Sequence, residues 1–215
     1  MQHLSVQGMT YTEEEIIIGC QKGHGAAQEA LYKTYASKMR YICIRYASST
    51  MEVDDIFQEA FIKIFNNIKN YKGDGSFEGW IRRIFVNTAI DSFKKDQKKL
   101  SRPLLDYDTH DKSETEHEES FESFAESLSK DEVLEIITQL PDGYKMVFNL
   151  YAIENYSHKE IASMLNITEG TSKSQLSKAR SLLRKQVKEY ALQNNHKIID
   201  IKFGVNRDIL GARPA

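Results

Sequence analysis

The sequence has few of the residues that cross-link small proteins or carry them into membranes. Only two cysteines, Cys20 and Cys43, occur in 215 residues, which excludes a disulfide framework. No stretch approaches about 18 consecutive apolar residues, and the amino terminus lacks the apolar run of a signal peptide. We therefore expect a cytoplasmic protein with reduced thiols.

Patterns that carry catalysis or bind metal ions are also missing. Cys20 and His24 have the i, i+4 spacing that places two ligands on one helix face, but no second pair of matching spacing accompanies them. No phosphate-binding loop or set of nucleophile and base follows. We expect helix packing at this pair rather than zinc, no cofactor, and no enzymatic activity, including activity on nucleic acids.

Net charge is close to zero, but its distribution along the chain is uneven. The formal net charge of −2 argues by itself against a nucleic-acid-binding protein. Residues 1–103 nevertheless carry a net charge of +3, residues 104–129 carry −8 and residues 130–215 carry +3. The acidic segment is rich in Ser, Thr, Asp and Glu and has almost no aliphatic periodicity, which is typical of a flexible linker between two basic domains.

Apolar residues recur with helical spacing on both sides of this segment. Residues 12–46 read as one or two helices, and a third helix spans about residues 77–95. Between them, an amphipathic helix begins at about Val53, with Asp54 and Asp55 in its first turn. Its apolar stripe consists of Val53, Ile56, Phe57, Ala60, Phe61, Ile64, Phe65 and Ile68. Helical patterning returns from Asp131, so the predicted fold is all-α, with two small helical domains joined by a flexible acidic linker.

The carboxy-terminal basic segment has the pattern of a helix-turn-helix. Ser157 and Glu160 form a predicted capping box, Asn166 is suited to end that helix, and Thr168 is suited to cap the next one. The second helix of such a pair enters the major groove of DNA. At about 100° per residue, one side of this helix gathers cations and small hydroxyls. We expect DNA contacts from Lys173, Ser174, Gln175, Ser177, Lys178, Arg180 and Arg184.

The amino-terminal segment offers two further candidate surfaces. Opposite the apolar stripe of the Val53 helix lie Asp55, Gln58, Glu59 and Ile62, an isoleucine ringed by polar groups that is typical of a protein-docking face. In the helix after residue 77, one stripe contains Trp80, Arg83, Asn87, Asp91 and Lys94. Cations and rings beside the glycine loop at residues 71–76 suit single-stranded DNA, although Trp80 is equally compatible with the core.

Together these stretches resemble the extracytoplasmic-function group of bacterial RNA polymerase sigma factors. The resemblance is carried, in family order, by residues 54–61, 71–81, 87–91, 140–141, 156–162, 169–176 and 178–180. It implies a region 2-like domain at 12–100, a linker at 101–129, a region 4-like helix-turn-helix domain at 130–190 and a tail of unassigned role at 191–215. It also implies a protein that binds core polymerase and directs promoter-specific initiation.

The resemblance implies roles for the same faces. Asp55, Gln58, Glu59 and Ile62 would dock on the clamp helices of the largest polymerase subunit. The minus-ten element would be captured and melted by Tyr71, Lys72, Phe77, Trp80, Arg83, Asn87 and Lys94. The minus-thirty-five element would be read from the second helix of the helix-turn-helix. An anti-sigma factor is a further implied partner.

Two positions depart from the family pattern. Ser172 stands where the family usually has an aliphatic residue, which bears on how the recognition helix is seated, and Ser177 is smaller than the usual side chain. The alternative reading is a stand-alone helix-turn-helix regulator that binds a palindromic duplex without polymerase.

Overall fold

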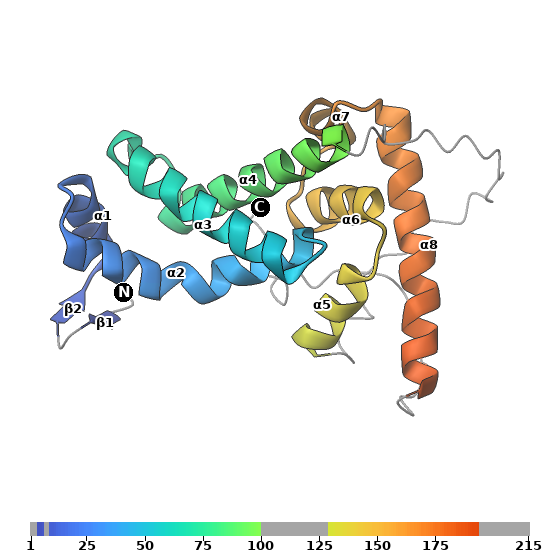
Figure 1. The fold of residues 1–215 in the computed structure, drawn as a ribbon, viewed down its shortest axis with the longest axis horizontal. Helices are drawn as coiled ribbons and strands as arrows, with labels where there is room; N and C mark the ends of the chain where they lie inside the picture. The colour runs from blue at the N-terminus through green and yellow to red at the C-terminus, as the bar shows by residue number, and fades with distance from the viewer. Residues whose placement is uncertain (1–3, 7–8, 100–128, 194–215) are drawn as a thin grey trace. The chain divides into compact units, whose positions relative to one another are not determined.

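The computed structural model describes residues 4–6, 9–99 and 129–193 (Figure 1). Two compact units are present, Met1–Ser92 and Phe93–Ala215, and helix α4 (Phe77–Lys99) runs across this division without a break. The expected linker and tail lie outside the described residues, apart from residues 129 and 191–193. The all-α fold is confirmed, with a short antiparallel hairpin of β1 (Leu4–Val6) and β2 (Met9–Tyr11) as an addition that the periodicity did not predict.

The first unit begins with two helices that meet closely. Helix α1 (Glu13–Gln21) starts at a capping box between Thr12 and Glu15, and α2 (Gly25–Tyr46) follows it. A Cβ atom on Gly19 would lie 2.5 Å from the Cβ of Ala27, so only glycine permits this approach of α1 to α2. Cys20 lies in α1 and His24 immediately precedes α2, so the two do not share a helix face as their spacing suggested.

Helix α3 (Thr50–Asn67) starts earlier than its apolar stripe indicated. The hydroxyl of Ser49 accepts a hydrogen bond from the backbone N–H of Glu52 and caps the helix, which begins at Thr50, three residues before Val53. The prediction that Asp54 and Asp55 occupy the first turn was therefore wrong. Because the capping residues are polar, the spacing of apolar residues cannot locate this helix start. A 3-10 turn, η1 (Ile68–Asn70), follows α3.

Aromatic rings from α3 and α4 form the centre of the first unit. The ring centroids of Phe57 and Phe61 are 4.9 Å apart, and that of Phe85 lies 5.3 Å from Phe61 and 5.9 Å from Phe57. All three side chains are buried. Edge-to-face pairs of this kind add about 0.5–1.5 kcal/mol each to the burial of apolar area, so they hold the outer faces of α3 and α4 in a defined orientation.

The second unit is a bundle around one long helix. It comprises α5 (Lys130–Thr138), α6 (Asp142–Phe148), the π-helical turn η2 (Asn149–Ile153), α7 (His158–Leu165) and α8 (Glu169–Gln193). Helices α5, α6 and α7 all pack on α8. The α8 side chains buried there include four apolar residues at helical spacing, namely Leu176, Ala179, Leu183 and Val187.

Candidate nucleic-acid and protein interfaces

Local sequence sets the geometry of the helix-turn-helix. The capping box of Ser157 and Glu160 starts α7, and Asn166 ends it in the left-handed conformation, with φ of 57°. The hydroxyl of Thr168 then accepts a 3.0 Å hydrogen bond from the backbone N–H of Thr171 at the start of α8. All three predicted helix boundaries are confirmed, so α8 is presented as the second helix of the motif.

One face of α8 reaches the surface and carries the predicted cations, which are exposed or half-buried. Lys173, Ser174 and Ser177 are exposed, whereas Lys178, Arg180 and Arg184 are half-buried. The guanidinium carbon of Arg180 lies 5.8 Å from the centre of the Tyr151 ring, a cation–π distance that limits where this side chain reaches.

Gln175 does not belong to this exposed face. Its side chain is 5% exposed, and Thr171, one turn earlier, is buried as well. The buried arc of α8 is wider than its apolar arc because α6 and α7 both pack on this helix. The sequence prediction that Gln175 contacts DNA therefore needs correction, since its amide faces the bundle.

Ser172 is fully buried at the position where an aliphatic residue was expected. Its Oγ lies 2.8 Å from Nδ1 of His158, whose ring stacks on Tyr151 with centroids 4.5 Å apart and planes at 21°. Burial, together with the nearby charges of Lys173 and Arg180, lowers the pKa of His158 from its ordinary value of 6.5. Periodicity gave no signal for this contact because the two partners are 14 residues apart.

The loop between η1 and α4 is held at both ends. The side-chain amide of Gln21 donates to the carbonyl oxygens of Ile68 and Tyr71, each at 3.3 Å, and the Tyr71 hydroxyl donates to the Gly75 carbonyl at 2.9 Å. Gly73 and Gly75 both have positive φ, 83° and 87°, a backbone conformation that other L-residues rarely adopt. The loop is thus a formed turn that exposes Lys72.

Three aromatic rings lie at the base of this loop. Trp80 stacks on Phe77 with centroids 5.8 Å apart and planes at 10°, and Tyr71 lies 5.3 Å from Trp80. Phe77 is 1% exposed, so the prediction that it contacts DNA is corrected: its ring is a core contact for the other two. Trp80 and Tyr71 are half-buried. The sequence left open whether Trp80 belongs to the core or to the surface, and its side chain belongs partly to each.

Beyond the loop, α4 presents a stripe toward solvent. Arg83 and Asn87 are exposed and Lys94 is half-buried. Asp91 is also exposed on this stripe, where it contributes a carboxylate among the cations.

The outer face of α3 is the candidate docking surface. Asp55, Gln58 and Ile62 are exposed, with Ile62 at 60%, and Glu59 is half-buried. The structure adds Met51, which is 75% exposed and lies 11 residues before Ile62, a whole number of helical turns. The sequence prediction missed Met51 because it started the helix at Val53.

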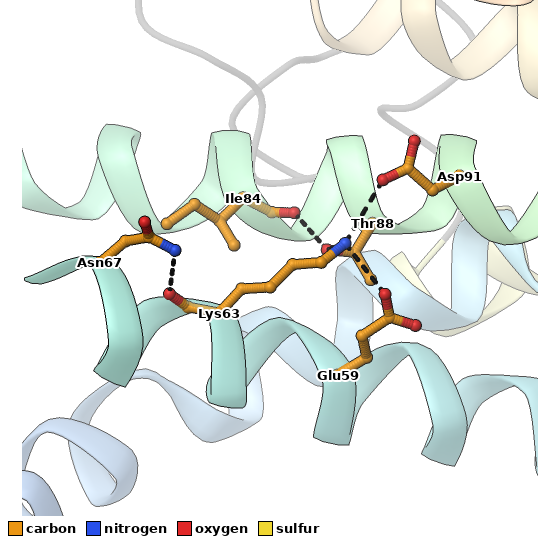
Figure 2. A network of polar contacts seen from close by, with 6 residues as sticks. All are labelled: Glu59, Lys63, Asn67, Ile84, Thr88 and Asp91. Carbon is orange, nitrogen blue, oxygen red and sulfur yellow. Dashed lines mark hydrogen bonds and ion pairs between the residues drawn. The ribbon is translucent and has the colours of Figure 1, made fainter.

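Lys63 joins this α3 face to the α4 stripe. Its Nζ lies 3.0 Å from a carboxylate oxygen of Glu59, 3.3 Å from one of Asp91 and 3.2 Å from the Thr88 hydroxyl oxygen. Figure 2 shows the side chain reaching from α3 toward α4, with Glu59 on its own helix. Burial lowers the pKa of Lys63, but the hydrogen bonds and charges of Glu59 and Asp91 outweigh it and the net shift is upward.

Metal sites and membrane spans are both absent from the described residues. Within residues 4–6, 9–99 and 129–193, no group of three or more His, Cys, Asp and Glu side chains could hold a metal ion. Over those residues, no helix is both long and apolar enough to cross a membrane.

Two stretches of the chain match models of known protein families. Residues 31–99 match the model described as sigma-70 region 2, and residues 130–183 match sigma-70 region 4. The ECF RNA polymerase sigma factor SigW of Bacillus subtilis is 31% identical over 180 residues, which cover 79% of this chain and 93% of that protein. The ECF sigma-E factor of Haemophilus influenzae is 27% identical over 185 residues, covering 82% of this chain and 95% of the relative.

Solved structures give weaker similarity. CnrH in complex with the cytosolic domain of CnrY aligns with a TM-score of 0.42 and 18% identity, over 81% of this chain and 96% of that chain. RpoE in complex with the anti-sigma factor NepR from Bartonella quintana aligns with a TM-score of 0.45 and 17% identity, over 74% and 96%. On its region 2 and region 4 matches and its likeness to SigW, the chain belongs to the extracytoplasmic-function sigma factors of the sigma-70 family, non-enzymatic proteins that direct transcription initiation by RNA polymerase.

Proposed function

We propose that the outer face of α3 docks on the clamp helices of the largest polymerase subunit. Ile62 and Met51 supply exposed apolar surface, and Asp55, Gln58 and Glu59 supply polar groups around it. An apolar centre with a polar rim is the usual anatomy of a protein interface. This exposed isoleucine among acidic and amide groups is the observation that carries the docking proposal.

The loop at residues 71–76 and the stripe on α4 are proposed to recognise and melt the minus-ten element. Tyr71 and Trp80 offer ring surface beside exposed Lys72, and Arg83, Asn87 and Lys94 follow the displaced strand. Stacking of a base on a ring contributes about 1–3 kcal/mol, comparable to the few kcal/mol that unpairing costs. Capture of displaced bases is therefore proposed to offset the cost of unpairing, so that no ATP is needed.

The exposed face of α8 is proposed to read the minus-thirty-five element. Lys173, Ser174, Ser177 and Lys178 lie near the amino-terminal end of the helix, where side chains reach base edges. Arg180 and Arg184 lie further along, and we assign them to phosphates, which fix register without reading sequence.

The remaining segments are assigned from family membership alone. We propose that the acidic linker at 101–129 threads a positively lined channel of polymerase, between a region 2 domain at 12–100 and a region 4 domain at 130–190. An anti-sigma factor is proposed as a regulatory partner, and the segment 191–215 as one place where it could bind.

Run-off transcription with purified core polymerase and a promoter library tests these assignments. We expect new start sites that require this protein, and each should have a shared sequence at minus ten and minus thirty-five. The free protein should bind the same promoters weakly. Initiation no higher than with core polymerase alone would contradict the proposal, and tight binding of the free protein to a palindromic duplex would favour a stand-alone regulator.

A further inference from the structure

Lys63 is fully engaged between the two proposed interfaces of the first unit. An ammonium group has three N–H donors, and three acceptors surround this one, from Glu59, Thr88 and Asp91. The Thr88 hydroxyl already donates to the Ile84 carbonyl at 2.8 Å, so toward Lys63 it acts as an acceptor. Figure 2 shows these contacts converging on one nitrogen atom.

The two carboxylates that share this ammonium belong to different surfaces. Glu59 lies on the α3 face that we assign to polymerase, and Asp91 lies on the α4 stripe that we assign to the displaced DNA strand. Both are part of the exposed surface, with side-chain exposures of 42% and 53%, and are within reach of a partner. Lys63 itself is less exposed, at 33%, and its stem is held between the helices.

The negative charge of Asp91 is unfavourable on a surface that binds DNA. A carboxylate beside Asn87 repels the phosphates that Arg83 and Lys94 attract, unless a cation neutralises it. In the free protein Lys63 neutralises it only in part, because the same ammonium also serves Glu59. A cation of polymerase that pairs with Glu59 would leave the Lys63 ammonium to Asp91.

We propose that Lys63 is a positioning residue that couples polymerase docking to binding of the minus-ten strand. Docking draws Glu59 into an ion pair with polymerase, Lys63 then pairs with Asp91, and the α4 stripe loses its repulsion for phosphate. This inference rests on the docking and strand-binding faces proposed above. It adds a residue that touches neither partner but transmits the effect of one to the other.

The experiment uses four proteins, the wild type, Lys63→Met, Asp91→Asn and the double variant, each bound to core polymerase. Methionine keeps the unbranched stem and removes the charge. The probe is the single-stranded non-template segment of a promoter obtained from the run-off library, with a fluorescent label, and the readout is its affinity for the holoenzyme. Lys69→Met, an exposed lysine in η1, is the matched control for loss of one positive charge.

We expect Lys63→Met to weaken strand binding about two- to fivefold, the size of one exposed charge interaction. Asp91→Asn should restore the affinity in the Lys63→Met background, and alone it should raise affinity slightly. The affinity of Lys63→Met for core polymerase should not fall, because Glu59 loses an internal competitor for its carboxylate. Lys69→Met should bind the strand more tightly than Lys63→Met.

Other outcomes separate a structural bridge from the proposed coupling. Equal losses of core and strand affinity in Lys63→Met, without rescue by Asp91→Asn, would show that Lys63 only holds α3 against α4. If Lys63→Met does not fold, the single variant Asp91→Asn still decides: its gain in strand affinity should be larger in the free protein than in the holoenzyme, and an equal gain in both overturns the proposal. Failure of the faces themselves is recognised separately, because Ile62→Asp and Arg83→Ala would then leave core and strand binding unchanged.

Discussion

The Nδ1 atom of His158, at the start of α7, lies 2.8 Å from the Oγ of Ser172 on the buried side of α8. This contact connects the two helices of the helix-turn-helix near the end of α8 that faces DNA in the proposed complex. The His158 ring also stacks on Tyr151, and Tyr151 lies under the guanidinium of Arg180. Ser172 and Arg180, about two turns apart on α8, are thus connected through His158 and Tyr151.

Ser172→Ala should destabilise the second unit by about 1 kcal/mol, the usual net value of one hydrogen bond. Urea unfolding of the full chain measures it, since the single tryptophan, Trp80, reports on the first unit and helicity reports on both. The tryptophan transition should stay in place while the helicity transition of the second unit moves to lower urea. Ser177→Ala, an exposed serine on the same helix, is the control and should leave both transitions unchanged.

The stability of the second unit should fall with acid. The folded-state pKa of His158 lies below its ordinary value of 6.5, so the unfolded chain binds the proton more readily. The stability that depends on neutral His158 is therefore fully present above pH 6.5. It is lost as pH falls below 6.5 through the depressed folded-state value.

An NMR titration of His158, with urea midpoints at several pH values, checks this pH dependence. Lys173 and Arg180 face the ring and oppose its protonation, whereas Glu169 favours it, and Ser172 and Tyr151 are its uncharged neighbours. His158→Phe keeps a ring for stacking and should flatten the dependence between pH 7 and 5. A His158 that titrates at or above 6.5 would contradict the prediction.

Ile62→Asp should weaken binding to core polymerase by at least about tenfold, because central apolar side chains dominate interface energetics. Met51→Asp should act in the same direction, since Met51 lies on the same face of α3. Fluorescence anisotropy of the labelled protein with core polymerase measures both, with circular dichroism as a check on folding. Ile18→Asp, at an exposed apolar position in α1, should have little effect, and a wild-type affinity for Ile62→Asp would remove the argument for this face.

Lys178→Glu should reduce initiation that depends on the minus-thirty-five element about tenfold or more, because a contact to a base edge contributes roughly 1–3 kcal/mol. Its affinity for core polymerase should be unchanged. Run-off transcription from promoters with intact and scrambled minus-thirty-five sequences measures the effect, with Lys130→Glu in α5 as a charge-matched control. A parallel loss of core binding and initiation would mean that the substitution disrupts the bundle.

Local patterns were sufficient for most of the helices and for the ends of the helix-turn-helix. The capping box of Ser157 and Glu160, the left-handed Asn166 and the cap at Thr168 all involve residues within four positions of one another. Such contacts form within one turn of chain and depend little on the rest of the protein. The exposed position of Ile62 was predictable for a similar reason, since it lies opposite a long apolar stripe.

Positions at the edge of a helical face could not be predicted in the same way. Gln175 and Phe77 were both expected at a surface, and both are buried. Periodicity gives the direction in which a helix is buried, but the width of the buried arc depends on how many neighbours pack against it. Helices α6 and α7 both pack on α8, and the rings of Tyr71 and Trp80 lie against Phe77.

The sequence by itself determined the all-helical fold, the two basic segments around an acidic one, and the family to which the chain belongs. Only the tertiary structure decided which polar groups meet across helices. Lys63 reaches Asp91 across 28 positions of sequence, and Ser172 meets His158 across 14. Contacts of this kind arise from the packing of one helix on another, and neither spacing nor composition encodes where two distant faces come together.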